Sequence, residues 1–98
     1  MLFAVLFEDD PAKAEMRARH MPAHLAFLEA NAASIRAAGP LKEPRDGAGA
    51  GGLWLVEAES AEIVEALVQA DPFWPTGLRR SARVLAWTRV FAEGRRQI

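Results

Sequence analysis

An apolar run at residues 2–8 constrains the fold more than any other segment of the chain. It is rich in Phe, Val and Leu, and acidic residues followed by Pro11 close it. A run of this length without polar alternation is typical of a central, largely covered strand. It lacks a basic leader and is too short for a signal peptide or a membrane span, so we expect a central strand in a cytoplasmic protein without membrane association.

The segment from Pro11 to Ala38 predicts one long helix. It is rich in Ala, Glu, Arg, Met and Leu and contains no glycine, and Gly39-Pro40 after it is a typical helix stop. Pro22 interrupts the segment. Either a short leading helix therefore hands over to a main helix with Pro22 in its first turn, or a single helix kinks there.

Three further strands are expected in the rest of the chain. They are predicted at residues 41–44, at 53–58 and at about 82–91. The glycine density of residues 45–52 predicts a flexible loop and excludes a regular element between the first two. The packing residues of the last strand are expected to include Val84, Trp87 and Val90.

A second helix is predicted from Ser60 to about Ala70. Ser60 is a suitable N-cap residue, and apolar residues follow it at helical spacing. The next segment, residues 71–77, contains two prolines and is expected to be rich in turns.

The predicted order of elements is strand, helix, strand, strand, helix, strand. This is the split βαβ, ferredoxin-like topology, an α+β fold in which two helices cover one face of a four-stranded antiparallel sheet. At 98 residues we expect a single domain over residues 1–98. A chain of this size leaves the other sheet face uncovered, so we expect a homodimer.

The charge balance and the absence of cysteine exclude several classes of function. Twelve basic against thirteen acidic side chains give a formal net charge of -1, without the basic excess that binding to nucleic acid requires. The strand at 53–58 also lacks the paired aromatic residues of an RNA-recognition domain. With no cysteine, the chain has no disulfide, thiolate nucleophile or iron–sulfur ligand.

His24 is the first candidate for chemistry. At about 100° per residue it falls on the inward stripe of its helix, together with His20, Phe27, Leu28, Asn31 and Ile35. An inward histidine is either a core imidazole bonded to a backbone carbonyl or a site residue, and a neighbouring carboxylate would favour proton transfer.

The spacing of His20 and His24 also raises the possibility of a metal site. Two imidazoles four residues apart share one helical face. Met21 and Pro22 follow the first histidine, however, where a zincin motif has an acid and a regular turn. We therefore expect no metal and no organic cofactor, and we place His20 at the rim of the site.

Asp71 is the second candidate. An Asp before a proline is common where a helix ends, and this structural role alone explains the residue. Phe73, Trp74 and Trp87 offer an apolar pocket wall around the carboxylate, although they fit a core or an interface equally well. Because both helices lie on one sheet face in this topology, we expect His24 and Asp71 to meet, with Phe73 or Trp74 near the rim.

Two charged or glycine-rich features carry a weaker signal. Arg79, Arg80 and Arg83 fit either an anion contact or a solvated face. The glycine-rich segment lacks the Gly-Lys-Ser/Thr ending and the following helix of a phosphate-binding loop.

Several motifs, in order along the chain, resemble the YCII-related (YciI-like) family. They comprise the apolar start at residues 1–7, Arg17, Met21-Pro22-Ala23-His24-Leu25-Ala26-Phe27-Leu28, Ala38-Gly39-Pro40-Leu41, Ala70-Asp71-Pro72-Phe73 and Thr76-Gly77-Leu78. The resemblance extends over nearly the whole chain.

This resemblance implies a fold and a site. Members of the family dimerise through their sheets as a dimeric α+β barrel, and a histidine–aspartate pair forms the active site of the family. By motif match this pair is His24 and Asp71. The family often has arginine before the proline, where this chain has Met21, so an anion contact at that position is not carried over.

Two functions follow as alternatives. The resemblance implies a cofactor-independent lyase or isomerase that transfers a proton on, or eliminates a group from, a small substrate of aromatic-derived type. Catalysis would fall to His24 and Asp71, and substrate binding to Phe73, Trp74 and His20. The alternative is a non-catalytic dimeric module that binds a small hydrophobic ligand or a partner.

Overall fold

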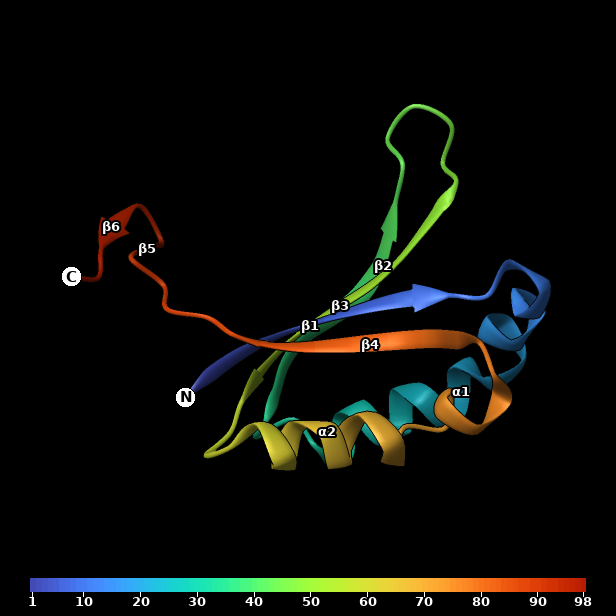
Figure 1. The fold of residues 1–98 in the computed structure, drawn as a ribbon, viewed down its shortest axis with the longest axis horizontal. Helices are drawn as coiled ribbons and strands as arrows, with labels where there is room; N and C mark the ends of the chain where they lie inside the picture. Colours follow the sequence, from blue (N-terminus) through green and yellow to red (C-terminus); the bar gives the residue numbers. More distant parts are fainter.

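The computed structural model describes residues 1–98 as an α+β fold with the expected topology. The four strands of its sheet are antiparallel in the order β2-β3-β1-β4, and both helices cover one face (Figure 1). The elements are β1 (Leu2–Asp9), α1 (Glu15–Ala30), β2 (Ile35–Lys42), β3 (Gly49–Glu57), α2 (Ala61–Ala70) and β4 (Arg79–Ala86). Shorter elements are the 3-10 turns η1 (Pro11–Lys13) and η2 (Trp74–Thr76) and the two-residue strands β5 (Phe91–Ala92) and β6 (Arg95–Arg96).

The apolar run at the start of the chain forms the central strand β1. It pairs with β3 on one side and β4 on the other, and Val5 lies opposite both Trp54 and Val84. Alternate residues of β1 point toward the helices and are buried, namely Phe3, Val5 and Phe7. The strand was expected at residues 2–8, and the structure confirms it.

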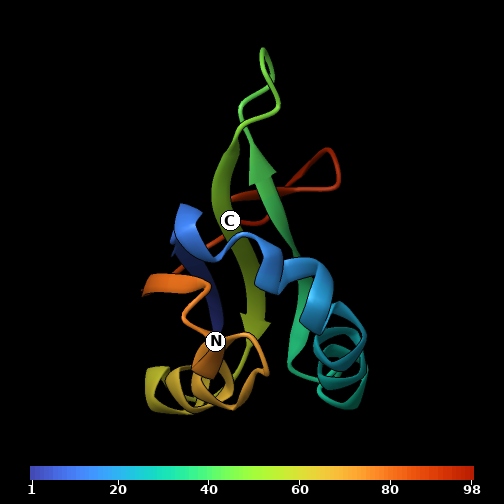
Figure 2. The same ribbon diagram turned by 90° about the vertical axis from the view of Figure 1, so that its right-hand side faces the viewer.

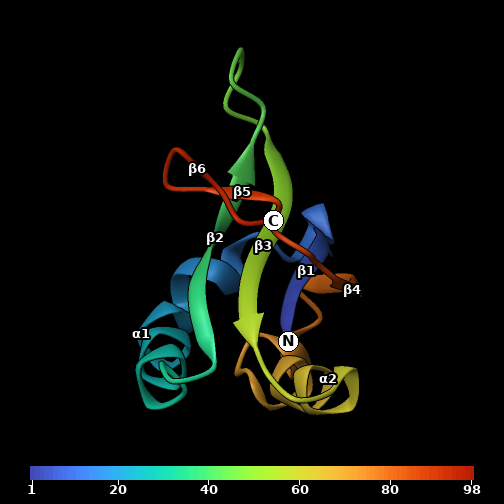
Figure 3. The same cartoon turned by 90° about the vertical axis from the view of Figure 1, so that its left-hand side faces the viewer.

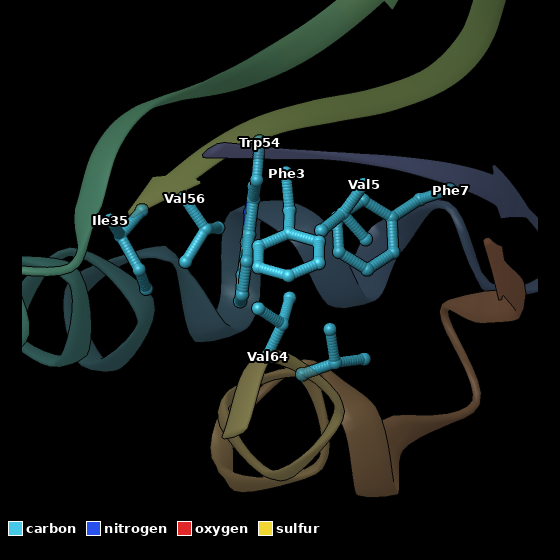
Figure 4. Close-up of a cluster of buried hydrophobic side chains, with 8 residues drawn as sticks. Phe3, Val5, Phe7, Ile35, Trp54, Val56 and Val64 are labelled. Atoms are coloured by element: carbon cyan, nitrogen blue, oxygen red, sulfur yellow. The ribbon is translucent and has the colours of Figure 1, made fainter. Parts of the chain in front are cut away.

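The hydrophobic core lies between the sheet and the two helices (Figure 4). It contains eight buried side chains: Phe3, Val5, Phe7, Ile35, Trp54, Val56, Val64 and Val68. The last two lie on the inward face of α2, whose first turn is capped by Ser60 as expected, with the Ile63 N–H donating to Ser60 Oγ at 3.3 Å. Burying this apolar stripe holds α2 against the sheet, and so positions the residue that follows the helix, Asp71.

The first helix ends eight residues earlier than the sequence predicts. Asn31 terminates α1, since its backbone N–H and its side chain both donate to the Phe27 carbonyl. The chain then enters β2 at Ile35, which pairs with Val56 of β3 and is buried in the core. Gly39-Pro40 is therefore not a helix stop but part of an edge strand, where a proline is tolerated.

Pro22 lies inside one continuous helix, so the two-helix alternative is wrong. Its ring is exposed on the outer side of α1.

The glycine-rich segment is more regular than expected. Residues 49–52 belong to β3 rather than to a flexible loop, and the turn before them is closed by a hydrogen bond of 2.8 Å from Glu43 N–H to the Ala48 carbonyl. Gly51 has a φ of 90°, and a Cβ there would lie 1.9 Å from the Phe7 carbonyl oxygen. Glycine is thus required for the close approach of β3 to β1.

The last strand begins and ends earlier than the predicted 82–91. It runs from Arg79 to Ala86, and Trp87 N–H makes a last bond of 2.9 Å to the Leu2 carbonyl. Trp87 and Val90 do not pack in this core, because they are 41% and 53% exposed. Their apolar character is what misled the prediction.

Both helices are too short or too polar to cross a membrane.

Candidate active site

His24 and Asp71 meet between the two helices. His24 lies on the sheet-facing side of α1, and Asp71 is the residue that caps the C-terminus of α2. The two elements lie side by side on one face of the sheet (Figure 2). His24 Nδ1 is 2.9 Å from Asp71 Oδ1, with side chains 8% and 0% exposed.

Asp71 is held by two further donors. Its Oδ1 also accepts the Phe73 backbone N–H at 3.0 Å, and its Oδ2 accepts Arg79 Nη1 at 2.5 Å. The backbone carbonyl of Asp71 accepts the Trp74 N–H at 2.9 Å. The turn that ends α2 therefore also positions the Asp71 carboxylate. Asp71 thus has both roles: it ends the helix, and it bonds His24.

These contacts keep Asp71 ionised. Burial by itself raises the pKa of this carboxyl, but the hydrogen bonds from His24 and Phe73 and the charge of Arg79 outweigh it. The pKa of Asp71 therefore lies below the ordinary aspartate value. An ionised carboxylate only accepts hydrogen bonds, so Nδ1 of His24 is the donor and carries the proton.

The other ring nitrogen of His24 is available. No protein group hydrogen-bonds Nε2, and Asp9 Oδ1 is the only fully enclosed side-chain polar atom without a partner. Nε2 therefore keeps some contact with solvent. A neutral imidazole with its proton on Nδ1 has its lone pair on Nε2, where it can accept a proton.

An aromatic ring fixes the plane of the imidazole. Phe73 stacks on His24 with ring centroids 4.1 Å apart and an interplanar angle of 18°. Phe73 is itself completely buried and is tied to Asp71 through its backbone. The histidine is thus held both by a hydrogen bond at its edge and by a ring against its face.

Arg79 is part of this cluster through its bond to Asp71, whereas the sequence offered it only as one of three arginines for an anion contact or a solvated face. Its guanidinium carbon lies 3.9 Å from the Phe7 ring centroid and 5.1 Å from that of Trp54, and its side chain is 5% exposed. Burial lowers the pKa of Arg79 and the Asp71 carboxylate opposes this, but a guanidinium remains charged at any physiological pH.

The three arginines expected to act together separate in the structure. Arg80 is exposed, 3.8 Å from Asp10, and Arg83 is exposed on the sheet. The sequence feature that could have identified Arg79 is its position after the turn. The turn after Asp71 returns the chain to the sheet, and Arg79 is the first residue of β4.

A cleft of about 550 Å³ opens beside this cluster, between the start of α1 and the β2–β3 hairpin. Arg17 lines the cleft and also approaches the Phe73 ring, with 5.6 Å from its guanidinium carbon to the centroid. Arg17 pairs with Asp9 Oδ2 at 2.5 Å. His24 and Asp71 do not line the cleft, and the link between the cleft and the imidazole is Phe73, which Arg17 approaches and which stacks on His24.

Three residues expected near His24 and Asp71 do not hydrogen-bond them through their side chains. Trp74 lines a separate hollow of about 220 Å³ with Val68, Ala82 and Val84. Trp87 lies beyond the end of β4 and is exposed, so it is not a wall of this pocket. His20 is half-buried on α1, and its side chain makes no hydrogen bond to Asp71 or to His24.

No group of three or more His, Asp or Glu side chains is arranged to hold a metal ion. His20 and His24 lie on the same helix, but Nδ1 of His24 is occupied by Asp71.

Comparison with known proteins identifies the family. The model of the YCII-related domain matches residues 1–88. A similar solved structure is 5-chloro-2-hydroxyhydroquinone dehydrochlorinase from Burkholderia phenoliruptrix, in complex with 2,5-dihydroxybenzoquinone; identity is 34%, the TM-score is 0.79, and the match covers 90% of this chain and 94% of that chain. A search of curated proteins gives no match. The order of motifs, the antiparallel sheet with both helices on one face, and these two matches agree: the chain belongs to the YCII-related domain family.

Proposed function

We propose that this protein is a cofactor-independent enzyme that moves a proton on a small organic substrate, as a lyase or an isomerase. The observation that carries the proposal is the buried hydrogen bond of 2.9 Å between His24 Nδ1 and Asp71 Oδ1, which leaves Nε2 free. The similarity to a dehydrochlorinase, at 34% identity over nearly the whole chain, supports the same class of activity.

In this proposal His24 is the proton carrier and Asp71 orients it. In an elimination, Nε2 takes a proton from the substrate, the electrons of the broken bond form a new double bond, and the leaving group departs with its bonding pair. In an isomerisation, the imidazolium returns the proton at a different atom. Asp71 stabilises the imidazolium that forms, because its Oδ1 already accepts the Nδ1 proton.

Phe73 and Arg79 position this pair. Phe73 covers one face of the imidazole, which directs the substrate toward the edge that carries Nε2. Arg79 neutralises part of the Asp71 charge and so keeps the carboxylate buried. His20, on the same helix, is proposed as a contact at the rim. Trp74 is left out of the substrate site, because it faces the other hollow.

The cleft beside Arg17 is the proposed substrate entrance. Its volume of about 550 Å³ suits a single-ring compound, and Arg17 and Lys42 line it. Cationic side chains favour oxygen substituents that carry negative charge, such as phenolate or enolate oxygens. The ring compound in the complex of the similar dehydrochlorinase, 2,5-dihydroxybenzoquinone, carries oxygen substituents. A substrate reaches His24 when the Arg17–Asp9 pair opens.

We also propose that the protein acts as a cytoplasmic homodimer. The sheet face opposite the helices carries a row of apolar side chains, of which Leu6 and Leu85 are each 37% exposed. A second copy covers this face in the manner of a dimeric α+β barrel.

A non-catalytic ligand-binding module is the second candidate, and one observation favours it. The side chain of His24 is only 8% exposed and does not line the cleft. A ligand that stays in the cleft would contact Arg17 and Lys42 without reaching the imidazole.

The test is turnover by matched variants. Hydroxylated and halogenated quinols, including 5-chloro-2-hydroxyhydroquinone, are incubated with the protein, and chloride release and absorbance are followed. For a compound that is turned over, His24→Gln is expected to lower kcat by about 10²–10⁴-fold. Ile63→Ala, on the outer side of α2, is the control and is expected to keep the wild-type rate.

Unchanged turnover in His24→Gln contradicts the proposed role of the pair. Binding of these compounds without any turnover, with affinity lost in Arg17→Gln and kept in His24→Gln, favours the binding module instead.

A further inference from the structure

The last twelve residues form an arm that leaves the body of the molecule (Figure 1). After Trp87, every hydrogen bond of this C-terminal arm (residues 87–98) is made within the arm itself, as in Gln97 N–H to the Val90 carbonyl at 2.8 Å. A pair of two-residue strands is not stable in water without packing. The arm therefore needs a surface to pack on.

The apolar side chains of the arm point to the same need. Four of them are exposed: Trp87 by 41%, Val90 by 53%, Phe91 by 60% and Ile98 by 77%. Exposed apolar residues grouped in one short segment mark an interaction site more often than scattered ones do.

A second projection rises from the opposite end of the sheet. Residues 41–51, the tip of the β2–β3 hairpin, extend beyond the last residue of β3 that pairs with β1, which is Gly52. The tip includes Leu41, 38% exposed, on the edge strand β2. Arm and hairpin tip both stand on the side of the sheet that the helices leave open (Figures 1 and 3).

The size of the molecule agrees with a missing partner. Its accessible surface is 6533 Å², whereas a compact chain of this mass exposes about 5,500 Å². Its radius of gyration is 14.1 Å, against about 12.6 Å for a compact domain of this length. The excess surface, about 1,000 Å², is of the size that one partner contributes to a stable interface.

We infer that the arm docks on the hairpin tip of a second copy of this chain. A two-fold axis that crosses the long axis of the molecule brings each arm to the partner's hairpin, because the two projections stand at opposite ends of the same face. Phe91 and Val90 then cover Leu41 and the unpaired edge of β2. The inference rests on the proposed homodimer and adds an exchange of arms to it.

Arm exchange also links the interface to the candidate site. Lys42 and Gly49–Gly51 belong to the hairpin tip and line the cleft beside Arg17. A docked arm therefore fixes one wall of the cleft in the partner subunit.

Sedimentation equilibrium of matched variants tests the energetics. Wild type is expected to be a dimer, and Phe91→Glu is expected to weaken dimerisation at least tenfold. Ile63→Glu is the control, since Ile63 is 45% exposed on the helical side, and is expected to dimerise as wild type does. A monomeric wild type overturns the proposed homodimer and the arm together, whereas equal dimerisation by Phe91→Glu overturns the arm alone.

Intermolecular paramagnetic relaxation tests the geometry. The chain has no cysteine, so Gln97→Cys gives one site for a nitroxide label. Labelled chains are mixed with unlabelled chains that carry ¹⁵N. Broadening of the amides of residues 41–51 in the ¹⁵N chains supports the exchange. A dimer in which these amides stay sharp overturns it.

Discussion

At the scale of single residues, Asp71 and Arg79 form a buried ion pair in which each charge needs the other. Their side chains are 0% and 5% exposed and lie 2.5 Å apart. Removing one charge strands the other in an apolar setting, which typically costs about 3–5 kcal/mol of folding stability, whereas replacing both is often close to neutral. Asp71→Asn is therefore expected to destabilise the protein strongly, and Asp71→Asn with Arg79→Met to recover most of the loss. Urea unfolding measures this, and additive losses would contradict it.

Asp71 also gives the stability of the fold an acid limit. The pKa of Asp71 is lower in the folded protein than in an unfolded chain, where an aspartate has a pKa of about 3.9. The stabilisation is complete above the unfolded value and is lost as pH falls toward the folded value, since the unfolded state then binds the proton first. The free energy of unfolding of wild type is thus expected to fall on acidification below about pH 4.

The matched variant for this acid limit is Asp71→Asn with Arg79→Met. It is expected to show a shallower loss over the same range of pH. Parallel curves for the two proteins would assign the acid sensitivity to other groups.

At the scale of elements, the β1–β3 pairing depends on Gly51. Its φ of 90° and the 1.9 Å that a Cβ would leave to the Phe7 carbonyl oxygen both exclude a side chain. Gly51→Ala is expected to cost at least about 2 kcal/mol of stability. Gly49→Ala is the control, because nothing lies within 4 Å of a Cβ there, and it is expected to change stability little. Equal thermal midpoints for the two variants would be inconsistent with this contact.

The elements that were correctly predicted are those whose signal is local. The apolar run of β1 and the Ser60 cap of α2 need no knowledge of distant residues. The predicted end of α1 and the predicted start of β3 were wrong, because Ile35 and Gly51 take their conformations from contacts with other elements. Composition favours a helix at 35–38 and a loop at 45–52, and tertiary packing overrides it at 35–38 and at 49–52, whereas 45–48 remain a turn.

The candidate site divides in the same way. The inward phase of His24 and the turn at Asp71 were readable in the sequence, and the helix topology placed them together. The burial of Arg79 could not be predicted from the sequence, since it depends on how the rings of Phe7 and Trp54 lie around the guanidinium.

At the scale of the whole molecule, the helical face and the open face have different roles. The helical face carries the core and the His24–Asp71 pair, whereas the open face carries exposed leucines and two projections (Figures 1 and 2). Trp87 and Val90 were expected among the packing residues of the last strand, and their exposure in the single chain shows that apolar character alone does not place a residue in its core. The proposed catalysis nevertheless depends on one atom, Nε2 of His24.

The most direct test of proton transfer by His24 is the tautomer of its ring, measured by long-range ¹H–¹⁵N correlation at neutral pH. The chain has two histidines, so His20→Gln leaves a single imidazole to observe. Proton transfer by His24 requires the proton of the neutral ring to lie on Nδ1, and Nε2 to respond when 2,5-dihydroxybenzoquinone or a related quinol binds. A ring that carries its proton on Nε2, or an Nε2 signal unmoved by every compound that binds, would contradict proton transfer by this histidine.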